Sequence, residues 1–419
     1  MSKLSLARAL GWSAAATLIK IAVDLLLIKW LAVAFGPDGV GRAGNFMALV
    51  AVLSALSGAG IHNGVTKYVA EFQHDPVRLR RLLGTAAALV LGCSSLLALL
   101  FILAAAPLSE LLFGSKDFQG VLRAIALIQL GMACAQFFLA ILKGRSDAKG
   151  TALSMISGSL LGLGAYWIAF RCGGYQGALI GLALVPALLV LPAGIMLCKS
   201  GIVPRNGLQL TWDGGLARNL LKFTAMMILT AISLPIAYTA IRELLAVHYG
   251  WDEVGIWQGM NRVSEAYLQL ITAPFTVYLL PALSRQKAKQ DFAHEIGRAQ
   301  RFLFPLAVAV SLSLWLLRDS VIGLFFSVEF RSMRDLFAWQ LSGDAFKISA
   351  YVFAYLVTAR ASLSLGVLTQ ISQFGLLLLF SHGLIPAGGA LGAVQAYAAT
   401  YVIYCALCAS AFFFYCKKD

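Results

Sequence analysis

Two rows of polar residues lie inside stretches that are otherwise apolar enough to form membrane-spanning helices. The first row, spaced i, i+4, i+7 and i+11, consists of Gln258, Arg262, Glu265 and Gln269. The second row, with the same spacing, consists of Gln340, Asp344, Lys347 and Tyr351. Each spacing places its residues on one helical face. A charge at the bilayer centre costs at least about 2.5–3.5 kcal/mol on insertion scales, so such residues face a bundle interior or a watery cavity. The two rows therefore predict a polar cavity and a transport function.

Further ionisable residues within the predicted spans extend this candidate binding site. The whole set is Lys20, Asp24, Lys29, Lys67, Arg242, Glu243, Arg262, Glu265, Asp344 and Lys347. Cations outnumber anions in it, which favours an anionic substrate. Arginine offers a planar fork suited to phosphate, and lysine offers a mobile point charge.

Three oppositely charged pairs in this set are one helical turn apart and are expected to form ion pairs. They are Lys20 with Asp24, Arg262 with Glu265, and Asp344 with Lys347. The alternative is that these pairs only hold helices together. For Lys29, the alternative is that its side chain reaches the headgroup region.

Composition identifies the elements that must position these residues. The 419-residue chain is 60% hydrophobic and only 12% charged, whereas soluble domains carry about 25% charged residues. Apolar runs of about 20 residues recur along it, each long enough to cross a bilayer core. Twelve spans are predicted, with centres near residues 21, 56, 94, 131, 161, 187, 231, 269, 308, 347, 372 and 402. The predicted fold is an all-α polytopic membrane protein.

The distribution of lysine and arginine predicts the orientation of the spans. With the N-terminus inside, 21 of the 33 basic residues fall in cytoplasmic segments and 7 in outer segments. This bias predicts that both termini are cytoplasmic. The net charge of +14 is thus explained by loops that meet anionic lipid headgroups, without a nucleic-acid partner.

The chain also repeats itself, which predicts two pseudo-symmetric six-helix lobes. Residues 35–41 resemble residues 249–255 at an offset of 214, and residues 177–179 match residues 389–391 at 212. The predicted lobes are residues 1–198 and 218–419, joined by a cytoplasmic loop at 199–217. Transporters built from such parallel repeats bind substrate between the halves.

Motifs typical of enzymes are missing from the sequence. It has no phosphate-binding P-loop and no His-Glu-x-x-His metal motif. The prediction is a secondary transporter without catalytic residues, metal or cofactor, driven by the membrane potential or by a proton or sodium gradient. The carboxylates that could couple an ion are Asp24, Glu265 and Asp344.

Six stretches carry a family resemblance: 31–41, 58–72, 251–259, 278–285, 333–355 and 389–404. They resemble the Wzx flippases of the multidrug/oligosaccharidyl-lipid/polysaccharide (MOP) exporter superfamily, and residues 335–340 (Asp-Leu-Phe-Ala-Trp-Gln) look specific to one branch. The resemblance implies a MATE-like pair of lobes in the bacterial inner membrane. It also implies transfer of an undecaprenyl-diphosphate-linked trisaccharide to the periplasmic leaflet for enterobacterial common antigen synthesis.

In the related flippases the lipid tail leaves between spans 1 and 8, which would place Lys20, Asp24, Arg262 and Glu265 near the headgroup. The partners implied are the lipid-linked oligosaccharide, membrane lipids, and a polysaccharide polymerase with chain-length proteins, the chain itself acting as a monomer.

Two other functions stay open at this point. An ion-coupled multidrug antiporter of the same superfamily would favour unpaired carboxylates and aromatics over this lysine and arginine excess. A membrane scaffold for the polymerase complex would not need rows of buried charges.

Overall fold

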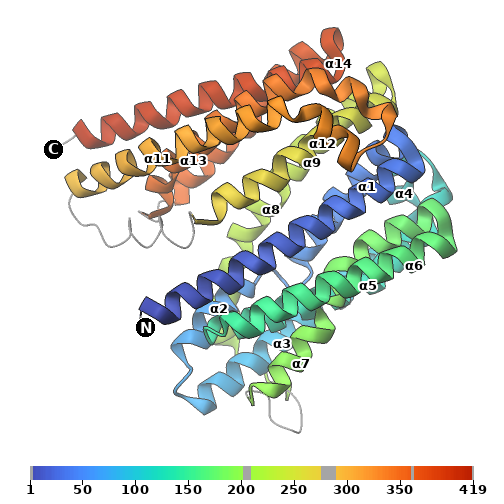
Figure 1. Cartoon of the computed structure of the whole chain (residues 1–419). Coiled ribbons are helices and arrows are strands. Elements are labelled where there is room, and N and C mark those ends of the chain that lie inside the picture. The colour runs from blue at the N-terminus through green and yellow to red at the C-terminus, as the bar shows by residue number, and fades with distance from the viewer. Residues whose placement is uncertain (1–2, 202–208, 275–288, 360–362, 418–419) are drawn as a thin grey trace. The chain divides into compact units, whose positions relative to one another are not determined.

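The computed structural model describes residues 3–201, 209–274, 289–359 and 363–417, and every regular element in these ranges is a helix (Figure 1). The helices before residue 202 are α1 (Lys3–Leu56), α2 (His62–Glu71), α3 (Pro76–Leu103), α4 (Ala105–Phe113), the 3-10 helix η1 (Lys116–Phe118), α5 (Gln119–Gly144), α6 (Ala148–Leu188) and α7 (Val190–Lys199). Those that follow are α8 (Gly214–Tyr249), α9 (Trp251–Pro274), α11 (Lys289–Leu316), α12 (Arg318–Phe325), the 3-10 helix η3 (Val328–Leu336), α13 (Phe337–Ala359) and α14 (Leu363–Lys417).

Three of the helices are kinked and each supplies two of the predicted spans. The backbone leaves the helical region at Gly36 in α1, Gly174 in α6 and Gly389 in α14. Each of the twelve predicted centres falls within a helix, so the all-α prediction is confirmed. The span centred near residue 56 is interrupted, because α1 ends at Leu56 and α2 starts at His62.

Five segments in the described part of the chain are long and apolar enough to cross a membrane by length and composition alone. They are Pro76–Leu103, Lys116–Gly144, Ala148–Lys199, Ala293–Leu316 and Thr369–Phe413. The two helices that carry the polar rows, α9 and α13, are not in this set, since polar and charged side chains lower their mean hydropathy.

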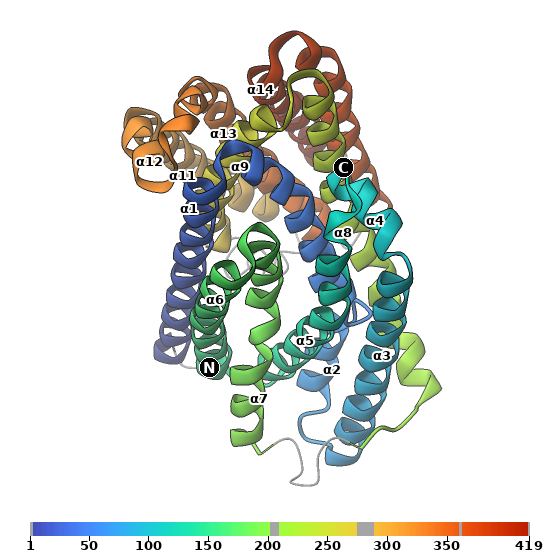
Figure 2. The same ribbon diagram turned by 90° about the vertical axis from the view of Figure 1, so that its right-hand side faces the viewer.

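The chain forms two compact units. Unit 1 contains residues up to Leu27 together with Asn45–Pro235. In it α5 packs against α3, α6 and α7 (Figure 2). Its core includes an apolar stripe of α3, formed by Leu79, Leu82, Leu83 and Ala86 at helical spacing. The start of α3 is set locally, because Asp75 caps it by accepting from the Arg78 backbone N–H at 3.1 Å.

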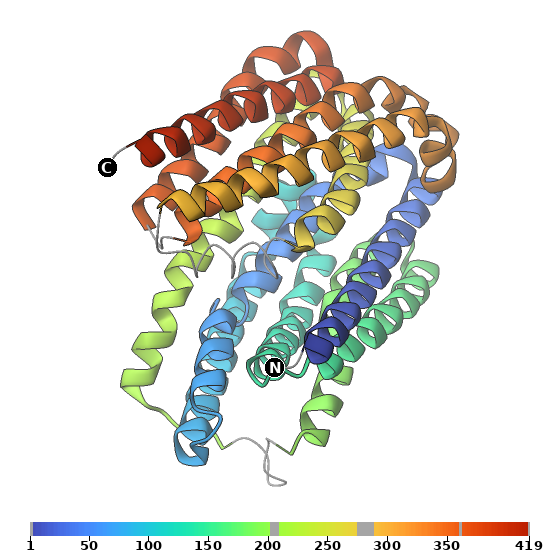
Figure 3. The same cartoon turned by 60° about the vertical axis from the view of Figure 1, so that its left-hand side comes forward.

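Unit 2 contains Ile28–Gly44 and the residues from Ile236 onward. Here α13 is packed between α14, α11 and α9, and Figures 1 and 3 show α11, α13 and α14 running side by side. Since α13 touches helices on several sides, the side chains around its polar row are enclosed by protein rather than lipid.

The boundaries of the two units fall at other residues than the boundaries of the two predicted lobes. Helix α8 runs through the predicted boundary at residue 217 without a break, and the unit boundary lies within it at Pro235. The described end of the predicted connecting loop is packed on α3, where the Asp213 N–H donates to Thr85 Oγ1 at 3.1 Å.

The backbone repeats the first sequence match in the same register and the second in a shifted one. Gly36 and Gly250, related by the predicted offset of 214, both have a positive φ, +61° and +84°. The equivalent kinks at Gly174 and Gly389 are instead 215 residues apart, so the predicted register of 212 between residues 177 and 389 is wrong by three. The sequence could not distinguish neighbouring glycines, whereas the structure shows that the glycine at the kink is Gly174 (φ +55°).

Candidate functional site

The two polar rows lie on adjacent helices of unit 2. Helix α9 begins directly after Gly250, and Asp252 and Glu253 in its first turn complement the positive end of the helix dipole. Helix α13 begins where η3 ends and packs against both α9 and α14. The rows are therefore completed by side chains from α14.

Asp344 of α13 is fully buried, with 0% of its surface exposed. Its Oδ2 accepts hydrogen bonds from Ser264 Oγ at 2.6 Å and from Tyr267 OH at 2.7 Å, both on α9. Its Oδ1 accepts from Tyr397 OH of α14 at 2.6 Å. Three hydroxyl donors thus satisfy a carboxylate that would otherwise be costly to bury.

Lys347 does not form the predicted ion pair with Asp344. In the described part of the chain the two are joined only through Tyr397, whose hydroxyl accepts from Lys347 Nζ at 3.1 Å and donates to Asp344. The ammonium also lies 5.9, 5.3 and 5.0 Å from the ring centroids of Tyr351, Tyr397 and Tyr401. We call these three residues the tyrosine cage. The predicted pair was wrong because the hydroxyl of Tyr397, from another helix, lies between the two charges.

Close packing of α13 on α14 positions the cage. A Cβ at Gly343 would lie 2.6 Å from Tyr397 Cδ1, so only glycine allows this ring to lie against α13. Further along, Gln373 Nε2 donates to Tyr401 OH at 2.7 Å and to Tyr351 OH at 3.3 Å. Gln373, in the first half of α14, therefore holds the hydroxyl groups of two of the three cage residues.

The other predicted pair in unit 2, Arg262 with Glu265, is confirmed. Arg262 NH1 lies 2.8 Å from Glu265 Oε2, with side chains 29% and 40% exposed. The nearby Gln269 is half-buried. Gln340 is buried and donates to Ser264 Oγ at 3.3 Å, so it joins the group of residues around Asp344.

Arg242 of α8 is only 2% exposed, and its Nε donates to Gln258 Oε1 at 3.1 Å. The guanidinium lies 5.9 Å from the Trp257 ring centroid. A Cβ at Gly44 would lie 2.7 Å from Arg242 Nε, which shows how closely α1 passes over this side chain. The structure thus places Arg242 and Gln258 together, inside the protein.

Lys29, which is half-buried, and Glu243, which is exposed, also belong to unit 2. The last three predicted site residues, Lys20, Asp24 and Lys67, belong to unit 1. Lys20 Nζ lies 2.7 Å from Asp24 Oδ2, so this predicted pair is confirmed, and both side chains are about half exposed, at 43% and 45%. Lys67 is exposed and lies 5.4 Å from the Tyr68 ring centroid. That Lys20 and Asp24 share one headgroup site with Arg262 and Glu265 stays a prediction, because these pairs belong to different units.

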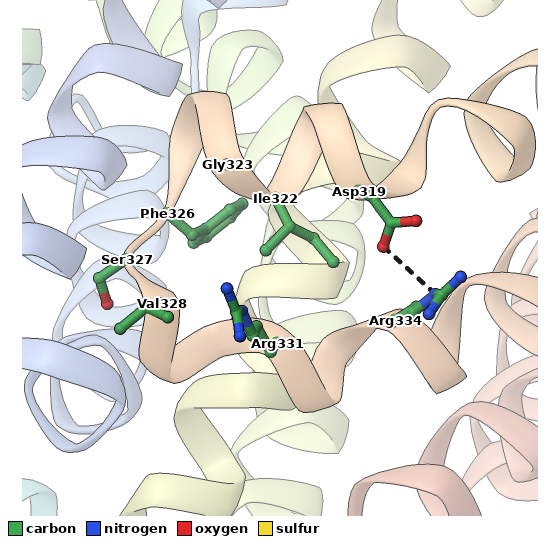
Figure 4. Close-up of a pocket in the computed structure, with 8 residues that line it drawn as sticks. All are labelled: Asp319, Ile322, Gly323, Phe326, Ser327, Val328, Arg331 and Arg334. Carbon is green, nitrogen blue, oxygen red and sulfur yellow. Dashed lines mark ion pairs between the residues drawn. The ribbon is translucent and has the colours of Figure 1, made fainter.

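A pocket that the sequence did not predict lies in unit 2 between α12 and η3 (Figure 4). It has a volume of about 650 Å³. Arg334 Nε pairs with Asp319 Oδ1 across it at 3.2 Å, and Arg331 lies alongside. None of the residues of the two polar rows lines this pocket.

Sequence reasoning missed the hydroxyl donors to Asp344. Ser264 and Tyr267 occupy α9 beside the predicted row, and Tyr397 comes from α14. One signal was present: Tyr397, Tyr401 and Tyr404 recur at i, i+4 and i+7, which places three phenols on one face of a helix.

The fold of this chain is shared with membrane transporters of known structure. A multidrug resistance MATE family transporter of the MOP superfamily in an inward-facing conformation superposes with a TM-score of 0.77 at 14% identity, covering 96% of both chains. The lipid II flippase MurJ in an inward closed conformation gives a TM-score of 0.73 at 13% identity, covering 98% of this chain and 87% of that one. At such identities the likeness concerns the fold alone. The fold class is that of a multi-pass, all-α transporter of the MOP type.

The sequence comparisons are more specific. Residues 6–287 match the family described as "Polysaccharide biosynthesis protein", and the chain belongs to this family. It is 55% identical over 415 residues to a protein of Escherichia coli (strain K12) named "Lipid III flippase", covering 99% of this chain and all of the relative. Together with the folds, these relatives indicate a transporter rather than an enzyme.

Proposed function

We propose that this chain is a flippase that moves lipid III, an undecaprenyl-diphosphate-linked trisaccharide, across the bacterial inner membrane for enterobacterial common antigen synthesis. The observation that carries the proposal is the 55% identity to the Escherichia coli Lipid III flippase over nearly the whole of both chains. The aligned stretch of 415 residues covers 99% of this chain, so it takes in the helices that carry the two polar rows.

The predicted polar residues of unit 2 have the chemistry that this substrate needs. We call them the polar group: Arg242, Gln258, Arg262, Glu265, Gln269, Gln340, Asp344 and Lys347. It brings Arg262 and Lys347, both partly exposed, onto adjacent helices. Cationic side chains of this kind bind phosphate oxygens through charge-assisted hydrogen bonds. Amide side chains such as Gln269 add donors and acceptors suited to sugar hydroxyls.

The direction and the driving force follow from charge. With both termini in the cytoplasm, as the basic residues favour, the diphosphate enters from the negative side of the membrane. Moving one charge across 100 mV is worth about 2.3 kcal/mol, so about two negative charges could gain roughly 4–5 kcal/mol on leaving the cell. Coupling to protons or sodium through Asp24, Glu265 or Asp344 is the alternative drive. Action as a monomer, and association with a polymerase or chain-length protein, stay predictions.

Translocation in proteoliposomes tests the proposal. A fluorescent polyprenyl-diphosphate trisaccharide is incorporated with the purified full-length chain, and its transfer is followed with and without an imposed potential. Protein-dependent transfer that rises with an inside-negative potential is the expected result. Transfer that instead follows a proton or sodium gradient would assign the drive to the carboxylates, and absence of transfer would refute the proposal.

An ion-coupled multidrug antiporter remains the second candidate, since the fold is shared with MATE transporters. The buried carboxylate Asp344 is already satisfied by three hydroxyls, and Glu265 is paired with Arg262. A cationic drug would find few unpaired carboxylates in this group. Drug efflux by the same proteoliposomes, without transfer of the lipid, would reverse the order of the two functions.

A further inference from the structure

The three cations of the polar group in unit 2 differ in what they contact. Arg262 is in an ion pair with Glu265 at 2.8 Å. Arg242 is 2% exposed and donates to the neutral amide of Gln258. Lys347 is half-buried, and in the described ranges its ammonium donates only to the hydroxyl of Tyr397. Lys347 is therefore the partly exposed cation whose charge is not balanced by a direct carboxylate partner.

We propose that Tyr397 is a positioning residue that keeps the Lys347 ammonium out of a direct ion pair with Asp344 and so leaves it able to bind a phosphate oxygen of the substrate. This inference rests on the proposed function and deepens it, because it names the cation that contacts the diphosphate and the residue that prepares it.

The hydroxyl of Tyr397 serves both charges at once. It accepts from Lys347 Nζ at 3.1 Å and donates to Asp344 Oδ1 at 2.6 Å, so one oxygen stands between them. Opposite charges attract strongly where the effective dielectric constant is low. Without this oxygen the ammonium, on its flexible stem, would move onto the carboxylate one helical turn away, and a neutralised pair attracts an anion weakly.

The tyrosine cage then defines where the ammonium rests. Its three ring centroids lie 5.0–5.9 Å from Nζ, within the range of cation–π attraction. This attraction leaves N–H bonds of the ammonium unused, because a lysine has three donors and Tyr397 takes one. A phosphate oxygen would complete its coordination without displacing the hydroxyl.

Binding of undecaprenyl diphosphate to the full-length chain in lipid nanodiscs tests the proposal. The variant Tyr397→Phe keeps the ring and removes the hydroxyl, and it is made both alone and with Asp344→Asn. A matched control is Tyr404→Phe, which removes another buried phenol from the same helix without touching Asp344 or Lys347. Thermal unfolding of each variant verifies that it is folded.

In the wild-type background Tyr397→Phe is expected to weaken binding about tenfold, and Tyr404→Phe less than about twofold. In the Asp344→Asn background the carboxylate that would capture Lys347 is gone, so Tyr397→Phe is expected to have little further effect. An equal loss in both backgrounds would overturn the proposal, since the effect of the hydroxyl on binding would then not depend on the carboxylate.

A second measurement needs no change at Asp344. The rate at which Lys347 reacts with an acylating reagent, read by mass spectrometry of its peptide, is expected to fall in Tyr397→Phe because the amine becomes ion-paired. An unchanged or faster rate would contradict the proposal. If the wild type flips the trisaccharide lipid but these results fail, only the inference fails. If the wild type neither binds nor flips it, the proposed function fails first.

Discussion

Residues 20–24 of α1 and residues 344–347 of α13 carry the same kind of charge pair, one helical turn apart, yet their structures differ. Lys20 and Asp24 meet directly at 2.7 Å and are about half exposed. Asp344 and Lys347 are separated by the hydroxyl of Tyr397, and Asp344 is fully buried. The exposed pair forms a direct ion pair, whereas each charge of the enclosed pair is hydrogen-bonded to neighbouring hydroxyl groups. Spacing along a helix therefore shows which charges are near, and packing decides whether they pair.

The largest expected effect is on the buried carboxylate. Asp344→Leu leaves three buried hydroxyls without an acceptor and is expected to lower the free energy of unfolding by about 3 kcal/mol or more. Asp24→Leu breaks an exposed pair and should cost within about 1 kcal/mol. Thermal unfolding of both variants in detergent measures the difference, and equal losses would remove the contrast between the two pairs.

The next effect concerns the contact of α13 with α14. In Gly343→Ala the new Cβ would meet the Tyr397 ring at 2.6 Å, so stability is expected to fall by about 1–3 kcal/mol through overpacking. Gly375→Ala on α14 is the matched control, because a Cβ there meets nothing within 4 Å. If Gly343→Ala is as stable as Gly375→Ala, then α13 and α14 can move apart at the tyrosine cage without loss of stability.

Transport should depend on the cation that the cage presents. Lys347→Ala is expected to lower the initial rate of lipid transfer about tenfold, or about 1.4 kcal/mol, while the unfolding temperature changes little. Arg262→Ala should give a smaller loss, since Arg262 already pairs with Glu265. Normal transfer by both variants at normal expression would show that neither Arg262 nor Lys347 is needed to bind the diphosphate.

The smallest effect is expected where the pair is direct. Exchanging the two residues, as Lys20→Asp with Asp24→Lys, keeps an i, i+4 ion pair and should retain stability within about 0.5 kcal/mol. The same exchange at 344 and 347 would bury an ammonium at a fully enclosed position, and it is expected to lower stability about as much as Asp344→Leu does. Expression and unfolding of both double variants compare the two pairs directly.

The sequence by itself determined the membrane-spanning helices, the polar rows and the family. Hydropathy runs and the i, i+4 periodicity are local properties, so the helices that carry Arg262 and Asp344 were predictable, as was the direct pair between Arg262 and Glu265. The repeat at offset 214 was also visible in the sequence. Gly36 and Gly250 both adopt a positive φ, a conformation that favours glycine, so the same residue type occurs at both positions.

Only the tertiary structure decided how the charges in the second row are satisfied. Tyr397 lies 53 residues from Asp344 in the chain, and no local pattern places its hydroxyl between a carboxylate and an ammonium. That contact depends on α14 approaching α13 at Gly343, while α9 supplies Ser264 and Tyr267. Hydrogen bonds between distant segments follow from packing, which periodicity along one helix does not contain.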